Sequence, residues 1–222
     1  MVKKAAHKAA APAESFAAKA ESRLPDRHMR LWLEAFFHPE KAVDSDRKNA
    51  NFQDTLIHLL FIGVTAGAAM ALSLLLASFF QPQMTIGSLA KGLLRIALVD
   101  VVMALSVGFG FSMLLYLLAM ILEGKGKYME QSHGITLAYG GQILASAPFN
   151  VLAGVPFLAP IMFPILFAIG VYTFYNYYLV VRHIHKITGF KAGLIIGISL
   201  LLLIAASVML ATWIAVSTAA KI

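Results

Sequence analysis

The chain contains no cysteine, and only 13% of its 222 residues are charged. The missing cysteines exclude disulfides and thiol chemistry. A soluble domain carries about 25% charged residues, whereas here 59% of the residues are hydrophobic and the mean hydropathy is +0.77. Also missing are the HExxH, Walker A, GxSxG, strand-linked GxGxxG and CxxCH motifs. The sequence therefore offers no catalytic residue and no cofactor site, and it predicts a membrane protein that is not an enzyme.

Five apolar stretches follow residue 54, and only short connections separate them. Each reaches the roughly 20 residues that a helix needs to cross about 30 Å of hydrocarbon. Because they lack the alternating pattern of a barrel strand, they predict helices. The expected fold is all-α, a polytopic integral membrane protein of five transmembrane helices. The expected spans are 55–80, 93–122, 134–155, 157–181 and 192–217.

The Lys and Arg residues collect on one side of these spans. Ten precede residue 55, two lie in the second connection and three in the fourth, which makes fifteen on one side. The other side has three, Lys91, Arg95 and Lys221. Because basic loops stay in the cytoplasm, the sequence predicts a cytoplasmic amino terminus and a carboxyl terminus outside.

The region before the first span divides into two parts. Residues 1–25 are rich in Ala and Lys and predict a disordered cytoplasmic tail. Residues 26–54 predict a short amphipathic helix, ended by Pro39, followed by a solvated connector. The helix either lies in the membrane interface or packs on the bundle, and both alternatives stay open. Its apolar face consists of Met29, Trp32, Leu33, Phe36 and Phe37.

Glycine and proline mark the expected helix contacts and interruptions. Gly63 and Gly67 form a GxxxG pair, for which close packing inside the monomer is favoured over a dimer face. Prolines remove backbone hydrogen bonds, so we expect a kinked or partly unwound fourth helix, which either lines a cavity or is covered by its neighbours. The predicted helix-breaking residues are Pro148 in the third span and Pro156, Pro160 and Pro164 at the fourth.

Three polar residues fall within the spans and are the candidate intramembrane sites. Asp100 lies about 10 Å from the outer end of its helix, and Asn150 reaches a similar depth, so the two side chains are expected to meet. Gln142 lies nearer the middle of the bilayer, where an interhelical hydrogen bond is the expected role.

Histidines gather on the predicted cytoplasmic side, at His58, His133, His183 and His185. Neutral imidazoles bind metals, but His183 and His185 point apart on a helix and the sequence shows no acidic residue to complete the set. We therefore predict no metal site.

Several short motifs follow one another in a recognisable order. The chain has Phe36-Phe37-His38-Pro39 before the spans, and Glu123-Gly124-Lys125-Gly126-Lys127-Tyr128 after the second. The third span carries Leu137-Ala138-Tyr139-Gly140 and Ala145-Ser146-Ala147-Pro148. Arg182-His183-Ile184-His185 and Gly189-Phe190-Lys191-Ala192 follow the fourth.

This combination, over residues 36 to 217, resembles the Yip family of Ypt/Rab-interacting membrane proteins. The resemblance implies a cytoplasmic amino terminus and, in eukaryotic members, a role in vesicle trafficking and in binding Rab-type GTPases. The short Ala/Lys tail departs from the longer cytoplasmic region of eukaryotic members, which implies a prokaryotic-type member in a cell membrane.

Two functions stay open for such a chain. The first is a non-enzymatic membrane scaffold or adaptor, with the lipid bilayer and a second copy or another membrane protein as partners. The alternative is a small-solute or ion permease that uses the proline-broken fourth helix and Asp100. The basic excess is explained by the membrane flank, so nucleic acid is not an expected partner.

Overall fold

The computed structural model describes residues 25–80 and 86–219, and within them every regular element is helical. The predicted tail at residues 1–25 lies, but for its last residue, outside this part of the chain. The elements before the long helices are α2 (Pro25–Phe37), α3 (Pro39–Asp46) and the short η1 (Arg47–Asn49). The others are α4 (Phe52–Phe80), α5 (Ile86–Leu105), η2 (Ser106–Phe111), α6 (Ser112–Ile121), α7 (Tyr128–Ala153), α8 (Ala159–His185) and α9 (Gly189–Ala219).

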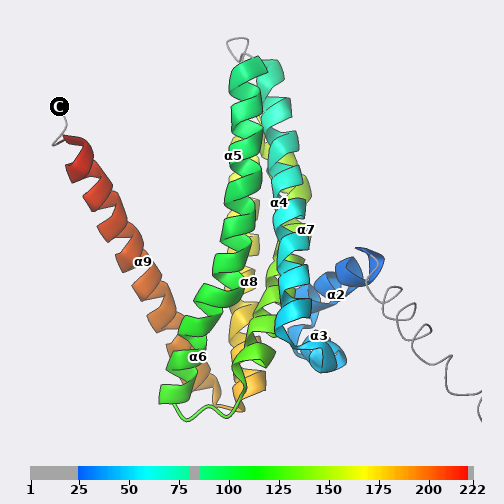
Figure 1. Ribbon diagram of the computed structural model, residues 1–222, viewed down its shortest axis with the longest axis vertical. Coiled ribbons are helices and arrows are strands. Elements are labelled where there is room, and N and C mark those ends of the chain that lie inside the picture. Colours follow the sequence, from blue (N-terminus) through cyan, green and yellow to red (C-terminus); the bar gives the residue numbers. More distant parts are fainter. Residues whose placement is uncertain (1–24, 81–85, 220–222) are drawn as a thin grey trace, which may run out of the picture.

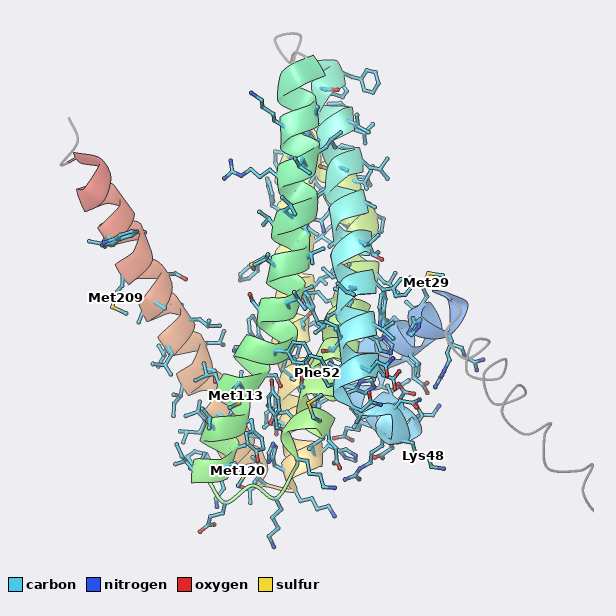
Figure 2. All side chains as sticks on the ribbon, viewed as in Figure 1. Met29, Lys48, Phe52, Met113, Met120 and Met209 are labelled. Atoms are coloured by element: carbon cyan, nitrogen blue, oxygen red, sulfur yellow. The ribbon has the colours of Figure 1, made fainter. Side chains whose placement is uncertain are left out.

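The long helices stand side by side in an up-and-down bundle (Figure 1). Helices α4 and α7 run in one direction, whereas α5, α6 and α8 run in the other. Helix α9 starts beside α6 and then leans away from the bundle. Helices α2 and α3 lie across α7 near the end at which α4 and α7 begin. Figure 2 shows that nitrogen and oxygen atoms gather at this end, around Lys48, whereas the upper halves of the helices carry mostly carbon.

Four of the described helical segments have both the length and the apolarity to cross a membrane. They are Phe52–Phe80, Ala90–Ile121, Ala159–His185 and Gly189–Trp213. Helix α7 has 26 residues, about 39 Å at 1.5 Å per residue, but it is less apolar. Its first turns carry buried polar side chains, among them Gln131, Ser132 and His133, which face other helices and not lipid.

The second apolar span is not a uniform α-helix, because residues Ser106–Phe111 form a π-helical segment between α5 and α6. A π segment shifts the backbone hydrogen bonds by one residue, and α7 supplies donors to the carbonyls of this region. Ser132 Oγ donates to the Gly108 carbonyl at 2.6 Å, and Tyr128 Oη donates to the Phe109 carbonyl at 3.0 Å. Gln131 Nε2 donates to the carbonyl of Ser112 at 2.7 Å. The polar side chains at the start of α7 therefore donate hydrogen bonds to the carbonyls of this irregular backbone.

The predicted solvated connector is exposed at most of its residues, but one face of it is buried. Pro39 ends α2 as expected, but it also occupies the first turn of α3, where its missing N–H costs nothing. The buried residues of α3 are Pro39, Ala42, Val43 and Asp46. They recur at the i, i+3, i+4, i+7 spacing of a docked helix face. Helix α3 therefore packs on the bundle.

The prolines interrupt the fourth helix less than the sequence predicts. Helix α8 begins at Ala159, so Pro156 precedes it, and Pro160 lies in the first turn, where proline is tolerated. Pro164 lies inside α8 and Pro148 inside α7, and both helices continue past them. The prediction of three interruptions on one helix face is therefore wrong for Pro156 and Pro160.

Gly63 packs inside the monomer, as the sequence favours. A Cβ atom there would lie 2.8 Å from the Cα atom of Val101 on α5. Gly193 and Gly197 on α9 differ, because a Cβ atom at either would meet nothing within 4 Å.

Candidate functional site

The most distinctive site is a buried polar cluster where α2, α3, α4 and α7 meet. Its central members are Asp46, His58 and His133, each at most 2% exposed. One ligand atom from each of the three lies within 4.8 Å of the other two. His28 of α2 joins them, since its Nδ1 lies 3.2 Å from His58 Nε2. Four helices therefore contribute one titratable side chain each.

Asp46 is the hub of the cluster. Arg27 and Asn49 donate to its Oδ1 atom at 2.9 and 2.6 Å. Its Oδ2 atom lies 2.9 Å from His133 Nε2 and 4.0 Å from His58 Nε2. Burial on its own would raise the pKa of Asp46. Hydrogen bonds from His133 and Asn49 and the charges of His133 and Arg27 outweigh it and hold that pKa below its usual value. Asp46 is therefore a buried carboxylate anion.

Hydrogen bonds fix the rings of both central histidines. The Thr55 hydroxyl donates to the Asn51 carbonyl at 2.7 Å, so the same oxygen accepts from His133 Nδ1 at 3.1 Å. His133 therefore carries a proton on Nδ1, and its Nε2 atom faces Asp46 Oδ2. Trp32 Nε1 donates to His58 Nδ1 at 2.9 Å, which makes that nitrogen an acceptor. Such outer partners orient imidazoles in metal and proton sites alike.

Helix α2 reaches this cluster because two glycines of α7 let it approach. A Cβ atom on Gly140 would lie 2.6 Å from the Trp32 ring, and one on Gly141 would meet the Trp32 carbonyl and Phe36. Asn176 of α8 donates to the Phe36 carbonyl at 2.9 Å. The Tyr139-Gly140-Gly141 sequence of α7 is therefore the surface on which α2 packs, and we call it the α2 docking site.

The predicted apolar face of α2 divides into two. His28, Trp32 and Ala35 are buried against the bundle, and Phe36 is partly buried. Met29, Leu33 and Phe37 are exposed at 42%, 47% and 61%. These three follow an i, i+4, i+8 spacing and form one outer stripe, and Figure 2 shows Met29 on the upper side of α2. We call them the outer stripe of α2.

A second network joins three of the sequence motifs at the same end of the molecule. Gly126 N donates to His185 Nδ1 at 3.2 Å, so His185 Nε2 carries the hydrogen that Gln131 Oε1 accepts at 2.5 Å. Lys191 of α9 donates to the Leu122 carbonyl at 3.1 Å and pairs with Glu123 at 2.8 Å. The hydrogen bond from Lys191 lowers the pKa of Glu123. The Gly-Lys loop is therefore held by α8 and α9.

The structure does not pair the three predicted intramembrane residues. Asn150 Nδ2 donates to Ser146 Oγ on its own helix at 3.3 Å, and among the described residues Asp100 Oδ2 is buried without a hydrogen-bond partner. The expected Asp100–Asn150 pair is therefore wrong. Gln142 lines a largely apolar cavity of about 600 Å³ between α5, α7, α8 and α9, and Pro156 lines a separate one of about 370 Å³. Asp100 lines neither cavity.

The sequence paired the wrong histidines. His185 belongs to the loop network, and His183 pairs with the exposed Asp44 at 2.9 Å. His133 instead lies close to His58 and Asp46. Asp46 is the acidic member of this cluster, and the sequence alone did not identify it. Only the i+7 spacing of Asp46 from Pro39, on the buried face of α3, could have pointed to it.

A comparison with protein families gives a match over most of the chain. The model of the Yip1 domain matches residues 33–211, most of the chain. The protein belongs to the Yip1-domain family. No curated protein and no solved structure matches the chain. Family membership and the four apolar spans make this a multi-pass membrane protein in contact with the lipid bilayer.

Proposed function

We propose that this protein is a non-enzymatic membrane scaffold whose working surface is the outer stripe of α2. The stripe supports this role because α2 is held rigidly from behind, by Trp32 on Gly140 and Gly141 and by the Asp46 cluster. An exposed apolar stripe on a docked helix suits insertion into the interface or contact with another membrane protein.

The proposal includes α7 as a fifth membrane span. At its start His133 contacts Thr55 of α4, and at its far end the position of Gly154 meets the Ser73 carbonyl. Thr55 and Ser73 are separated by about 27 Å of helix, close to the thickness of the hydrocarbon core. Helix α7 is less apolar because other helices cover it. Five crossings would put the two termini on opposite sides of the membrane, and the fifteen-to-three distribution of Lys and Arg favours the amino terminus in the cytoplasm.

The outer stripe is tested by replacing Met29, Leu33 and Phe37 together with serine. Because all three are exposed, the variant is expected to keep the melting temperature of the wild type in detergent. Both proteins are purified from native membrane in mild detergent, and Phe190→Ser, a change at an exposed residue of α9, is the matched control. We expect the triple variant to lose specific co-purifying proteins that wild type and control retain.

The same proteins are then reconstituted into vesicles to test the permease alternative. A scaffold gives no saturable solute flux. Saturable flux through the wild type, together with an unchanged set of co-purifying proteins in the triple variant, would overturn the proposal.

A further inference from the structure

We propose that Asp46, His58 and His133, with His28 as fourth donor, bind a divalent transition metal ion of the Zn²⁺ class. The inference does not depend on the scaffold function. Two or three imidazoles with one carboxylate form a donor set typical of zinc. Each donor comes from a different helix, so the ion would link α2 and α3 to α4 and α7.

The donor spacing fits a small tetrahedral ion. Zinc–ligand bonds of 2.0–2.2 Å place tetrahedral donors about 3.3–3.6 Å apart. The separations in the cluster are 2.9 Å for Asp46–His133, 3.2 Å for His28–His58 and 4.0 Å for Asp46–His58. The ligand atoms of the three central residues all lie within 4.8 Å of one another, so their side chains have to move closer together by about 1 Å to bind one ion.

The second argument is the direction of the His133 lone pair. Because Nδ1 gives its hydrogen to Thr55, Nε2 of a neutral His133 faces the Asp46 anion with a lone pair. Two lone pairs at 2.9 Å repel each other, so a cation has to lie between them, either a proton on Nε2 or a metal ion. When a metal ion binds, that proton leaves to water and Nε2 becomes a ligand.

Arg27 opposes the binding of a metal ion, and Trp32 reports on it. The guanidinium of Arg27 on Asp46 Oδ1 adds positive charge, but Arg27 is itself 40% exposed and lies at the rim. Trp32 donates to His58 Nδ1. If His58 binds the metal through Nδ1, that lone pair is used. If it binds through Nε2, Nδ1 has to carry the proton. Either way the Trp32 hydrogen bond breaks.

The test uses Trp32 as the reporter. The chain has two tryptophans, so Trp213→Phe leaves Trp32 alone. The full chain, without a polyhistidine tag, is stripped with a chelator in detergent and titrated with Zn²⁺. We expect a saturable change in Trp32 fluorescence at one ion per chain and a higher melting temperature. Co²⁺ should give the visible absorption of a tetrahedral site, and Mg²⁺, which prefers oxygen ligands, should do neither.

Variants locate the ion. Asp46→Asn and His133→Gln should weaken Zn²⁺ binding at least tenfold, whereas His183→Ala, at a histidine outside the cluster, should leave it unchanged. Arg27→Gln should tighten binding several-fold by removing the opposing charge, and it keeps the proposal testable if Asp46→Asn does not fold. Absence of stoichiometric binding by the wild type, or affinity that does not respond to Arg27→Gln and His133→Gln, would overturn the proposal.

Discussion

Asp100 and Asp46 are two acidic residues with opposite surroundings. Asp100 lies in an apolar span, and its Oδ2 atom has no hydrogen-bond partner in the described part of the chain. Asp46 lies outside the spans, and Arg27, Asn49 and His133 all bind it. An acid inside a span costs roughly 2.5–3.5 kcal/mol on insertion scales, whereas removing the charge of a buried, paired carboxylate costs about 3–5 kcal/mol.

We therefore expect Asp100→Asn and Asp100→Leu to leave the melting temperature unchanged or raise it. Asp46→Asn should lower the free energy of unfolding by about 3 kcal/mol, because His133 and Arg27 would lose their charged partner. Thermal unfolding in the same detergent checks all three variants. A loss of stability in Asp100→Leu as large as that in Asp46→Asn would mean that Asp100 has a structural partner.

The sequence identified Asp100 and missed Asp46 for one physical reason. A charge inside an apolar run stands out without any knowledge of the fold. Asp46 lies among Lys, Asp, Arg and Asn residues that resemble a solvated loop. Its burial depends on the docking of α3, which is a tertiary contact that local composition does not encode.

At the scale of elements, α2 shows how much a helical pattern predicts. The spacing located the helix and placed Trp32, Leu33 and Phe37 on its apolar side. It did not divide that side into a docked face and an outer stripe, because the division is set by Gly140 and Gly141 on a helix about 100 residues away. The π segment was missed for a similar reason, since its carbonyl partners belong to α7.

The packing of α2 on its docking site is tested by Gly140→Ala. The new Cβ atom would lie 2.6 Å from the buried Trp32 ring, and overpacking of this kind costs about 1–3 kcal/mol. We expect lower stability and faster proteolysis between α2 and α4. The control is Gly170→Ala on α8, where a Cβ atom meets nothing within 4 Å and helix propensity favours alanine by about 1 kcal/mol. If both variants unfold alike, α2 does not dock as described.

At the scale of the whole molecule, hydropathy identifies the helices whose surfaces face lipid, and it gives a weaker signal for a helix that its neighbours cover. Helices α4, α5, α8 and α9 present apolar side chains outward, so their sequences mark them as spans. The polar residues of helix α7 form hydrogen bonds to the π segment, to the start of α6 and to the Asp46 cluster. The sequence predicted a span at 134–155 because that stretch is apolar and about 20 residues long, and the alternating helix directions in Figure 1 are consistent with five crossings.

The number of crossings is tested with two reporters, one active only in the cytoplasm and one active only outside. We expect cytoplasmic activity for fusions at the amino terminus and in the loop at residues 124–127. We expect outside activity for insertions in the turn at residues 154–158, just after α7, and for a fusion at the carboxyl terminus. The reason is the fifteen-to-three distribution of Lys and Arg together with the run of α7 beside α4.

The turn at residues 154–158 is the decisive position, because it lies outside only if α7 crosses the bilayer. The loop at 124–127 is its control, since it flanks the other end of α7. A cytoplasmic signal at both positions would show that α7 is re-entrant. The molecule would then have four spans and both termini on one side.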